Sequence, residues 1–322
     1  MTTALDLLAG RAPPPFLAET TARDRNWRWV ALMAVVGPLA TIIMSFLVVL
    51  ALFASGQFAG VPLNVIGGDL SDMPRLLKSS VYIFEVGIGL AAAAAGLLLA
   101  ARLIFKRPLR SWITVAPRFR WTLLGWGAVA GVVAIMALNL LSVFLPQGPG
   151  QAPILDAGAP LTERLAYVAA SGLGFLIAGW AEEVVFRGYL LQQVGAFTRR
   201  VWLVLLINGV VFALFHLEFD PGALAARALL GMVFAWATLR LGGLEFGIGA
   251  HATQNLGVAM FGEVLLSGAP ETTLKLSDLG FELVLAAVIL ACVEWLYRRR
   301  TAANPSPLAG EGGPAEQGRM RG

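Results

Sequence analysis

Eight long apolar runs constrain the fold of this chain more than any other feature. They cover residues 29–54, 80–104, 121–145, 163–181, 201–217, 223–240, 243–262 and 279–297. A helix needs about 20 apolar residues to cross the hydrocarbon core of a bilayer. The runs are continuous rather than alternating, so helices fit them and barrel strands do not. We therefore predict an all-α polytopic membrane protein with about eight transmembrane helices. The fourth to seventh runs are short or interrupted, and only the Gly242–Gly243 pair separates the sixth from the seventh.

The composition agrees with a multi-span membrane protein. Hydrophobic residues make up 57% of the 322 residues and charged residues only 14%, whereas soluble domains carry about a quarter charged residues. The net charge of +4 is explained by basic residues that flank membrane helices, so we expect no nucleic-acid partner. The single cysteine, Cys292, excludes an intrachain disulfide and a cysteine-based metal cluster.

Basic residues alternate between the two sides of the predicted membrane. With both termini on one side, the N-terminal segment, alternate loops and the C-terminal tail hold 18 of the 24 Lys and Arg residues. Cytoplasmic loops of membrane proteins carry such an excess. We therefore expect an integral protein of the cell (inner) membrane with both termini cytoplasmic, although an endomembrane fits the same topology.

Two flanking segments differ from the central region. Residues 1–28 are polar and proline-interrupted, without the pattern of a cleavable signal peptide. Residues 29–297 form the predicted transmembrane domain. Residues 298–322 are basic at first and then rich in Pro, Gly and Ala, which is typical of a disordered tail.

A few ionisable or strongly polar side chains fall at membrane depth. These are Glu85, Glu182, Glu183, Arg187, His216, His251 and Asn255. A charge at the centre of a membrane helix costs roughly 3 kcal/mol or more, so each is a candidate for function. The chain has only two histidines, and both are in this set. We expect most of the set to line a polar intramembrane cavity.

Helical spacing predicts which of these side chains share a face. Glu183 and Arg187 are four residues apart and can pair along one helix. Glu182 points about 100° away from Glu183 and is available for another role. His251 and Asn255 are also four residues apart, so both can project into one cavity.

Three motifs carry a resemblance to a known family. "EEVVFR", "FALFH" and "HATQN" follow the pattern Glu-Glu-x-x-x-Arg, Phe-x-x-x-His and His-x-x-x-Asn in that order. The chain resembles the CPBP family of intramembrane proteases over about residues 160–260. This family includes the type II CAAX prenyl endopeptidases and bacterial bacteriocin-processing or immunity proteins. The eight-span layout is similar as well.

The resemblance implies hydrolysis of peptide bonds in membrane-associated protein or peptide substrates. It assigns water activation to Glu182 and His216, and it makes His251 and Asn255 the donors to the oxyanion. Donors held at that position contribute about 3–4 kcal/mol to catalysis. No serine or cysteine nucleophile motif accompanies these residues. Direct attack by water is therefore favoured over an acyl-enzyme.

The metal requirement stays open at this point. Glu182, His216 and His251 could form a zinc site with one position left for water. The chain lacks the His-Glu-x-x-His motif that places two ligands on one helix. We therefore favour a reaction without a cofactor and keep zinc as the alternative.

Several alternatives use the same residues. The resemblance gives Glu183 and Arg187 a supporting role, but they could form a purely structural ion pair. The whole site could belong to a non-catalytic membrane scaffold or immunity protein, or to a proton-coupled transporter. Glu85 fits no motif and is expected to reach toward the membrane surface. The Gly127–Gly131 and Gly243–Gly247 spacings predict close helix packing.

Overall fold

The computed structural model describes residues 3–10, 13–58, 73–142, 152–262 and 279–303. Regular structure in these ranges is helical, apart from an isolated bridge between Thr114 and Gly243. The long helices are α3 (Trp27–Phe58), α4 (Arg75–Phe105), α5 (Trp121–Ser142), α6 (Leu161–Glu183), α9 (Pro221–Leu241), α10 (Glu245–Phe261) and α11 (Leu279–Ala303). The shorter ones are α1 (Ala4–Leu8), α2 (Pro15–Ala18), α7 (Leu191–Phe197) and α8 (Val201–Leu214). The predicted all-α class is confirmed for this part of the chain.

The predicted number of eight spans is not confirmed. Five helical segments of the described residues are long and apolar enough to cross a membrane. They are Trp27–Leu52, Arg75–Phe105, Trp121–Leu140, Leu161–Phe197 and Pro221–Leu241. Helices α8 and α10 occupy the predicted fifth and seventh spans, but they have only 14 and 17 residues. Both are shorter than a typical spanning helix.

The fourth predicted span ends too early. We expected it to stop at residue 181, but α6 continues through the π-helical turn η4 (Val184–Leu190) into α7. The result is one apolar helical segment of 37 residues. The charges of Glu183 and Arg187 do not end the helix because they neutralise each other inside it. Helix α11 likewise continues to Ala303, beyond the predicted end at 297. Residues 304–322, which include most of the predicted disordered tail, lie outside the described residues.

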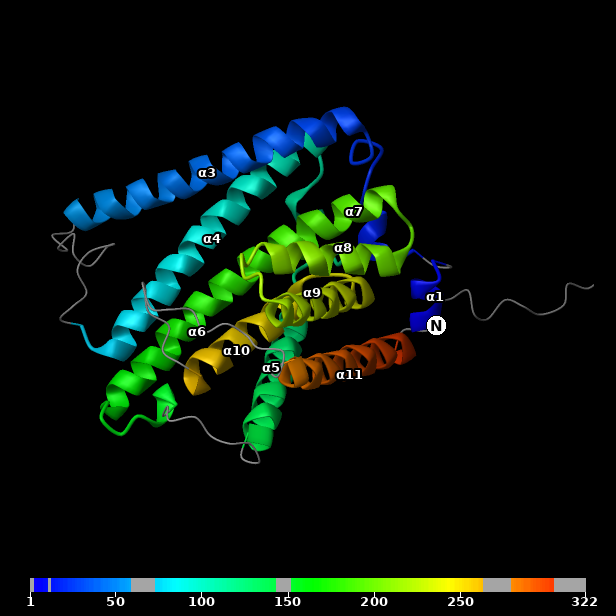
Figure 1. The fold of residues 1–322 in the computed structure, drawn as a ribbon. Helices are drawn as coiled ribbons and strands as arrows, with labels where there is room; N and C mark the ends of the chain where they lie inside the picture. Colours follow the sequence, from blue (N-terminus) through cyan, green and yellow to red (C-terminus); the bar gives the residue numbers. More distant parts are fainter. Residues whose placement is uncertain (1–2, 11–12, 59–72, 143–151, 263–278, 304–322) are drawn as a thin grey trace, which may run out of the picture.

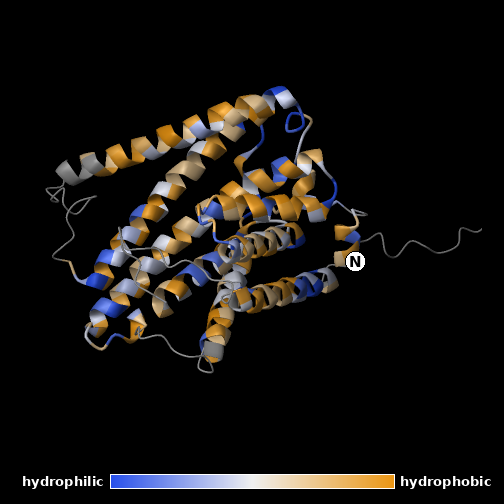
Figure 2. Cartoon of the chain, in the orientation of Figure 1, coloured by the Kyte–Doolittle hydropathy of each residue, from blue (hydrophilic) through white to orange (hydrophobic). Residues whose placement is uncertain are grey.

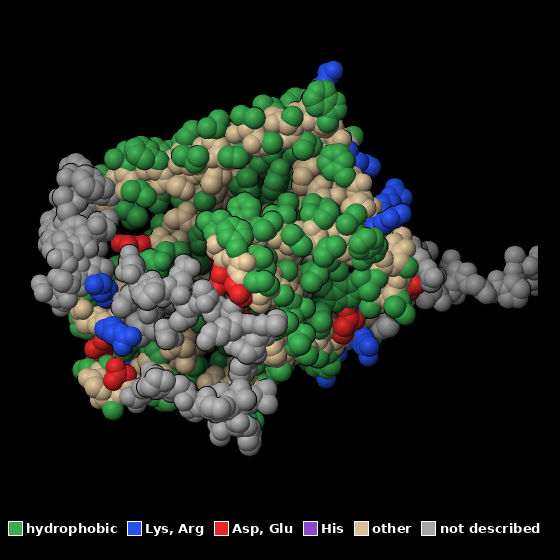
Figure 3. Space-filling model, viewed as in Figure 1, with side chains coloured by type: hydrophobic (Ala, Val, Ile, Leu, Met, Phe, Trp, Pro, Cys, Tyr) green, Lys and Arg blue, Asp and Glu red, His purple; other side chains and the backbone are tan. Residues whose placement is uncertain are grey.

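Apolar side chains cover much of the outer surface. Along α3 the large exposed ones are Leu32, Val35, Leu39, Ile42, Ile43, Phe46, Leu47, Val49 and Leu50. Apolar colour runs along the lengths of the helices in Figure 2, and Figure 3 shows the same surface in space-filling form. Soluble monomers rarely expose apolar patches of this extent, so the patch faces lipid. Most Lys and Arg side chains visible in Figure 3 gather at the end where α3 begins. The cytoplasmic assignment of that end stays a prediction.

Helix α10 lies inside the bundle and brings its polar residues to the centre. It packs against α5 and α6, while α4 packs between α3 and α6 (Figure 1). Helix α9 contacts α8 and α11. The first half of α10, from Glu245 to Ala252, is buried throughout. This arrangement places α10 beside the end of α6, where the two glutamates lie.

The predicted close packing at Gly127 and Gly131 is confirmed. A Cβ at Gly127 would collide with the backbone carbonyl of Phe246 on α10, and a Cβ at Gly131 would meet Thr253. Two turns of α5 therefore approach α10 at backbone contact distance. Small residues allow such approaches in membrane bundles.

We expect Gly127→Ala to destabilise the protein by about 1–3 kcal/mol, because the new methyl group forces α5 away from α10. Gly125→Ala is the matched control on the same helix, since nothing lies within 4 Å of its Cβ position. Thermal unfolding of both variants in detergent compares them. Equal melting temperatures would show that α5 and α10 do not pack in this way.

Candidate active site

The two glutamates lie where α6 changes its helical geometry. Glu182 and Glu183 are the last two residues of α6, and Arg187 lies in the π-helical turn η4. A π-helical turn contains one residue more than an α-helical turn and occurs often at functional sites. Asn208 on α8 stabilises the turn by donating a 2.7 Å hydrogen bond to the Phe186 carbonyl. The turn thus has a specific partner on a neighbouring helix.

Glu183 and Arg187 form a fully buried ion pair. Arg187 Nη1 lies 3.0 Å from Glu183 Oε1, and both side chains have no exposed surface. The Arg187 guanidinium also lies 4.3 Å from the centre of the Phe212 ring. Arg187 Nη2 donates to the Gly231 carbonyl at 3.3 Å. The expected pairing along one helix face is confirmed. The contacts of Arg187 with Phe212 and Gly231 also connect the turn to α8 and α9.

His251 on α10 lies between the two glutamates. Its Nδ1 is 3.1 Å from Glu183 Oε1, and its Nε2 is 3.7 Å from Glu182 Oε2. A carboxylate only accepts hydrogen bonds, so Nδ1–H is the donor to Glu183. The imidazole stacks on the Phe234 ring with centroids 5.1 Å apart. The first and third motifs therefore meet at this ring.

Gly247 makes this approach sterically possible. A Cβ at this position of α10 would lie 2.8 Å from Glu183 Oε2. The predicted role of the Gly243–Gly247 spacing in close packing is thus confirmed for Gly247. The group that Gly247 contacts is the Glu183 side chain rather than the backbone of another helix.

His216 follows the end of α8 and is half-buried. Its Nδ1 lies 2.8 Å from the Phe212 carbonyl, and its ring meets the Phe212 ring edge-on. A carbonyl accepts, so Nδ1 carries the proton and Nε2 of the neutral ring is left as an acceptor. The Phe212 ring also meets the His251 ring edge-on, with centroids 6.1 Å apart. The second motif therefore lies in the same cluster as the other two.

Asn255 is one turn beyond His251 on α10 and is half-buried. Within the described parts of the chain, no hydrogen bond joins its side chain to the other candidate residues. Its predicted role as an oxyanion donor stays a prediction.

Comparison with known proteins shows a similarity over the same region. Residues 164–257 match the family model described as type II CAAX prenyl endopeptidase Rce1-like. This part of the chain is therefore similar to an Rce1-like domain. The match includes all six candidate residues from Glu182 to Asn255, and the family is one of CAAX protease-type membrane peptidases.

One curated relative extends beyond the Rce1-like domain. The uncharacterized protein YyaK of Bacillus subtilis (strain 168) is 30% identical over 192 residues. The alignment covers 58% of this chain and 60% of YyaK, so the chain spans less than two thirds of that relative's length. The likeness to YyaK therefore gives no information on the activity or substrate of this chain.

The Rce1-like domain does not present a ready three-ligand metal site. Within the described ranges, no three His, Cys, Asp or Glu side chains lie close enough together to hold a metal ion. The alternative zinc set of Glu182, His216 and His251 is not among such groups, and the cofactor requirement stays a prediction. In both His216 and His251 the hydrogen bond is made by Nδ1, so Nε2 lies on the side of the ring away from that partner.

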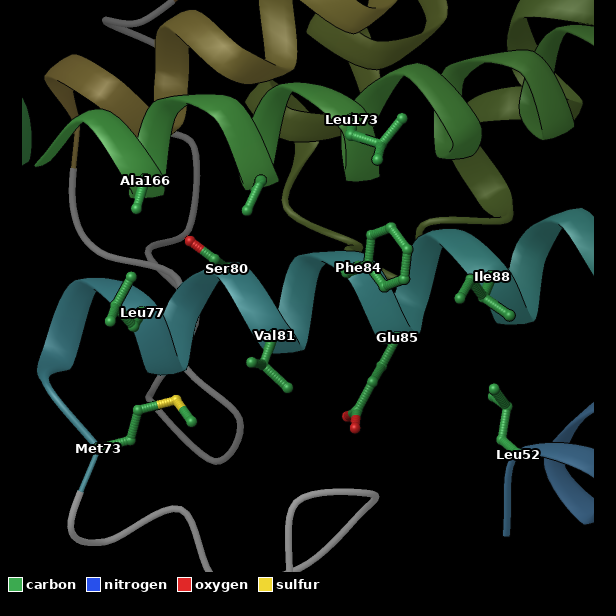
Figure 4. A pocket seen from close by; sticks show the side chains of 11 residues that line it. Leu52, Met73, Leu77, Ser80, Val81, Phe84, Glu85, Ile88, Ala166 and Leu173 are labelled. Carbon is green, nitrogen blue, oxygen red and sulfur yellow. The ribbon is translucent and has the colours of Figure 1, made fainter. Parts of the chain in front are cut away.

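A cavity of about 590 Å³ lies away from the six motif residues Glu182 to Asn255. It is lined mostly by apolar residues of α3, α4 and α6, with Met73 just before α4 and the polar side chains of Ser80 and Glu85 (Figure 4). An α-helix turns by 100° per residue. The Glu182 side chain therefore leaves α6 about 150° away from the average direction of the cavity-lining Ala166, Ala170 and Leu173. The cavity therefore does not open onto Glu182. The predicted polar cavity around the candidate residues stays a prediction.

Some residues of the site were not predicted from the motifs. Phe234 and the Gly231 carbonyl on α9 contact His251 and Arg187. Asn208 on α8 bonds the π-helical turn through the Phe186 carbonyl. Position 208 continues the four-residue row of Phe212 and His216, which is the one signal in the sequence that pointed to it.

Proposed function

We propose that this protein is an intramembrane endopeptidase that hydrolyses peptide bonds of membrane-associated protein or peptide substrates. The observation that carries the proposal is the His251 ring, whose two nitrogens face the carboxylates of Glu182 and Glu183. This contact joins two motifs that are 68 residues apart in sequence. The match to the Rce1-like family model supports the more general assignment, to a family of membrane peptidases.

In the proposed reaction, Glu182 and His216 activate a water molecule. The Glu182 carboxylate takes a proton from the water while the oxygen attacks the carbonyl carbon of the scissile bond. His216 Nε2 accepts the second hydrogen bond of the water, because Nδ1–H is already bonded to Phe212. General base catalysis of this kind contributes about 10²–10⁴-fold.

His251 and Asn255 are the proposed donors to the oxyanion. His251 donates through Nε2 only when both ring nitrogens carry protons, since Nδ1–H is committed to Glu183. The C–N bond then breaks, and the proton held by Glu182 passes to the leaving amine.

The proposal needs no metal or other cofactor. It places the protein in the cell (inner) membrane with both termini cytoplasmic and lipids as its surroundings. Arg187 orients Glu183 toward His251 through the 3.0 Å ion pair, so the pair supports the site without touching substrate.

A fluorogenic peptide library tests the proposal with detergent-purified protein, with and without a strong zinc chelator. We expect cleavage by the wild type that the chelator does not change. Loss of cleavage on chelation, restored by zinc, would replace the metal-free mechanism with a zinc mechanism. Failure to cleave any soluble or membrane-anchored peptide would favour the non-catalytic scaffold.

A further inference from the structure

The N-terminal segment is packed into the structure, although its sequence is largely polar. We call residues 13–26, which precede α3, the N-terminal strap. Phe16 of this strap is fully buried, and α2 packs against α7 and α9. A Cβ at Gly195 on α7 would lie 2.7 Å from a methyl group of Leu17, so the strap fits closely against α7.

Asp24 connects the strap to the end of α4. Its side chain is 1% exposed and accepts a 2.8 Å bond from Arg107 Nη1. Arg107 is also buried, and its guanidinium stacks 3.9 Å from the centre of the Trp112 ring. A buried charge of this kind is stable only while its partner is present.

Two consecutive glutamines attach α7 to this ion pair. Gln193 Nε2 donates to the Asp24 carbonyl at 2.8 Å. Gln192 accepts from Arg107 and donates to the Ser111 carbonyl at 2.8 Å. Both glutamine side chains are buried. Helix α7 is thus held by the strap on one side and by the short helix η2 (Leu109–Trp112) on the other.

The same contacts reach the π-helical turn that follows Glu182 and Glu183. A Cβ at Gly188 in η4 would lie 2.6 Å from the Trp112 carbonyl. Helix α6, η4 and α7 are continuous, so any rotation of α7 is transmitted to the turn. A π-helical turn is less stable than an α-helical one and keeps its register only if its surroundings hold it.

We infer that the N-terminal strap, through Asp24, Arg107 and Gln192, positions Glu182 and Glu183 by holding the register of η4. Asn208 and the Glu183–Arg187 pair hold the turn from the α6 side. The strap network holds it from the α7 side. Loss of the network lets the turn relax toward α-helical geometry, which rotates the glutamates relative to His251. The role in catalysis rests on the proposed peptidase function, whereas the role in holding η4 does not.

The test uses the full chain in detergent and two variants of the network, Asp24→Asn and Gln192→Leu. Gln192→Leu keeps the Asp24–Arg107 ion pair, so it can still test the network if Asp24→Asn does not fold. Arg25→Gln is the control, because Arg25 is the exposed neighbour of Asp24. Asp24→Glu restores the carboxylate and is the conservative variant.

Hydrogen–deuterium exchange of peptides from residues 184–197 is the first measurement. We expect exchange roughly tenfold faster in both network variants, from the loss of a hydrogen bond to a charged group, and wild-type exchange in Arg25→Gln and Asp24→Glu. Unchanged exchange at 184–197, or equal acceleration throughout α3 and α5, would overturn the inference.

Peptidase kinetics are the second measurement. We expect kcat of Asp24→Asn and Gln192→Leu to fall about tenfold with KM unchanged, and Asp24→Glu to recover it. A rise in KM without a change in kcat would contradict a positioning role. If wild-type protein cleaves no peptide, the proposed function fails, and the exchange measurement still decides whether the strap holds η4.

Discussion

Glu182→Gln is expected to lower kcat by about a thousandfold while leaving the protein folded. The amide keeps the size of the carboxylate but does not take a proton from water. Glu182 is 18% exposed, and its contact with His251 is long at 3.7 Å. Replacing it therefore leaves no buried charge without a partner. The measurement is kcat for a peptide that the wild type cleaves, together with the melting temperature in detergent.

Glu163→Gln is the matched control, since Glu163 lies in the first turn of the same helix, far from the cluster. It is expected to retain wild-type kcat. His216→Ala and Asn255→Ala are expected to abolish cleavage as well, without unfolding the protein. A Glu182→Gln protein that keeps more than about a tenth of the activity would exclude this carboxylate as the base.

The second large effect concerns stability rather than catalysis. Glu183→Gln is expected to destabilise the protein by about 3–5 kcal/mol, because it leaves the Arg187 charge buried without its partner. Arg187→Met is expected to cost less. In that variant Glu183 retains its hydrogen bond from His251. The double variant is expected to recover most of the stability and none of the activity, because His251 loses its carboxylate partner.

Denaturant or thermal unfolding of the two single variants and the double variant forms a double-mutant cycle. Glu218→Gln provides the comparison, since it breaks the more exposed Glu218–Arg227 pair. Such pairs contribute about 1 kcal/mol or less. If Glu183→Gln costs no more than Glu218→Gln, the Glu183–Arg187 pair is not the buried, mutually dependent unit described above.

Local features of the site were predictable because they depend on spacing along one helix. Glu183 and Arg187 pair across four residues, as the motif indicates. The hydrogen bond from His251 to Glu183 joins different helices, and no spacing rule in a single sequence contains it. The number of crossings was less predictable. The fourth predicted run ends at residue 181, whereas the helical segment continues to Phe197, because Glu183 and Arg187 pair inside the bundle.

The burial of the N-terminal strap could not be predicted from the sequence either. Its polar, proline-interrupted sequence indicated a segment apart from the membrane domain. In the structure the buried Asp24 carboxylate accepts hydrogen bonds from its neighbour Thr21 and pairs with Arg107, while Gln193 donates to the Asp24 carbonyl. Arg107 and Gln193 are far from Asp24 in sequence, so its polarity alone gave no sign of burial.

The sequence by itself determined that this chain forms membrane helices and which polar residues they carry. Hydrophobicity and helical periodicity act over one or a few turns, so they can be read from neighbouring residues. Only the tertiary structure decided that His251 contacts Glu182 and Glu183, that η4 is π-helical and that the strap holds α7. These features depend on contacts between helices, where steric fit at glycines such as Gly247 and the pairing of buried charges select one arrangement.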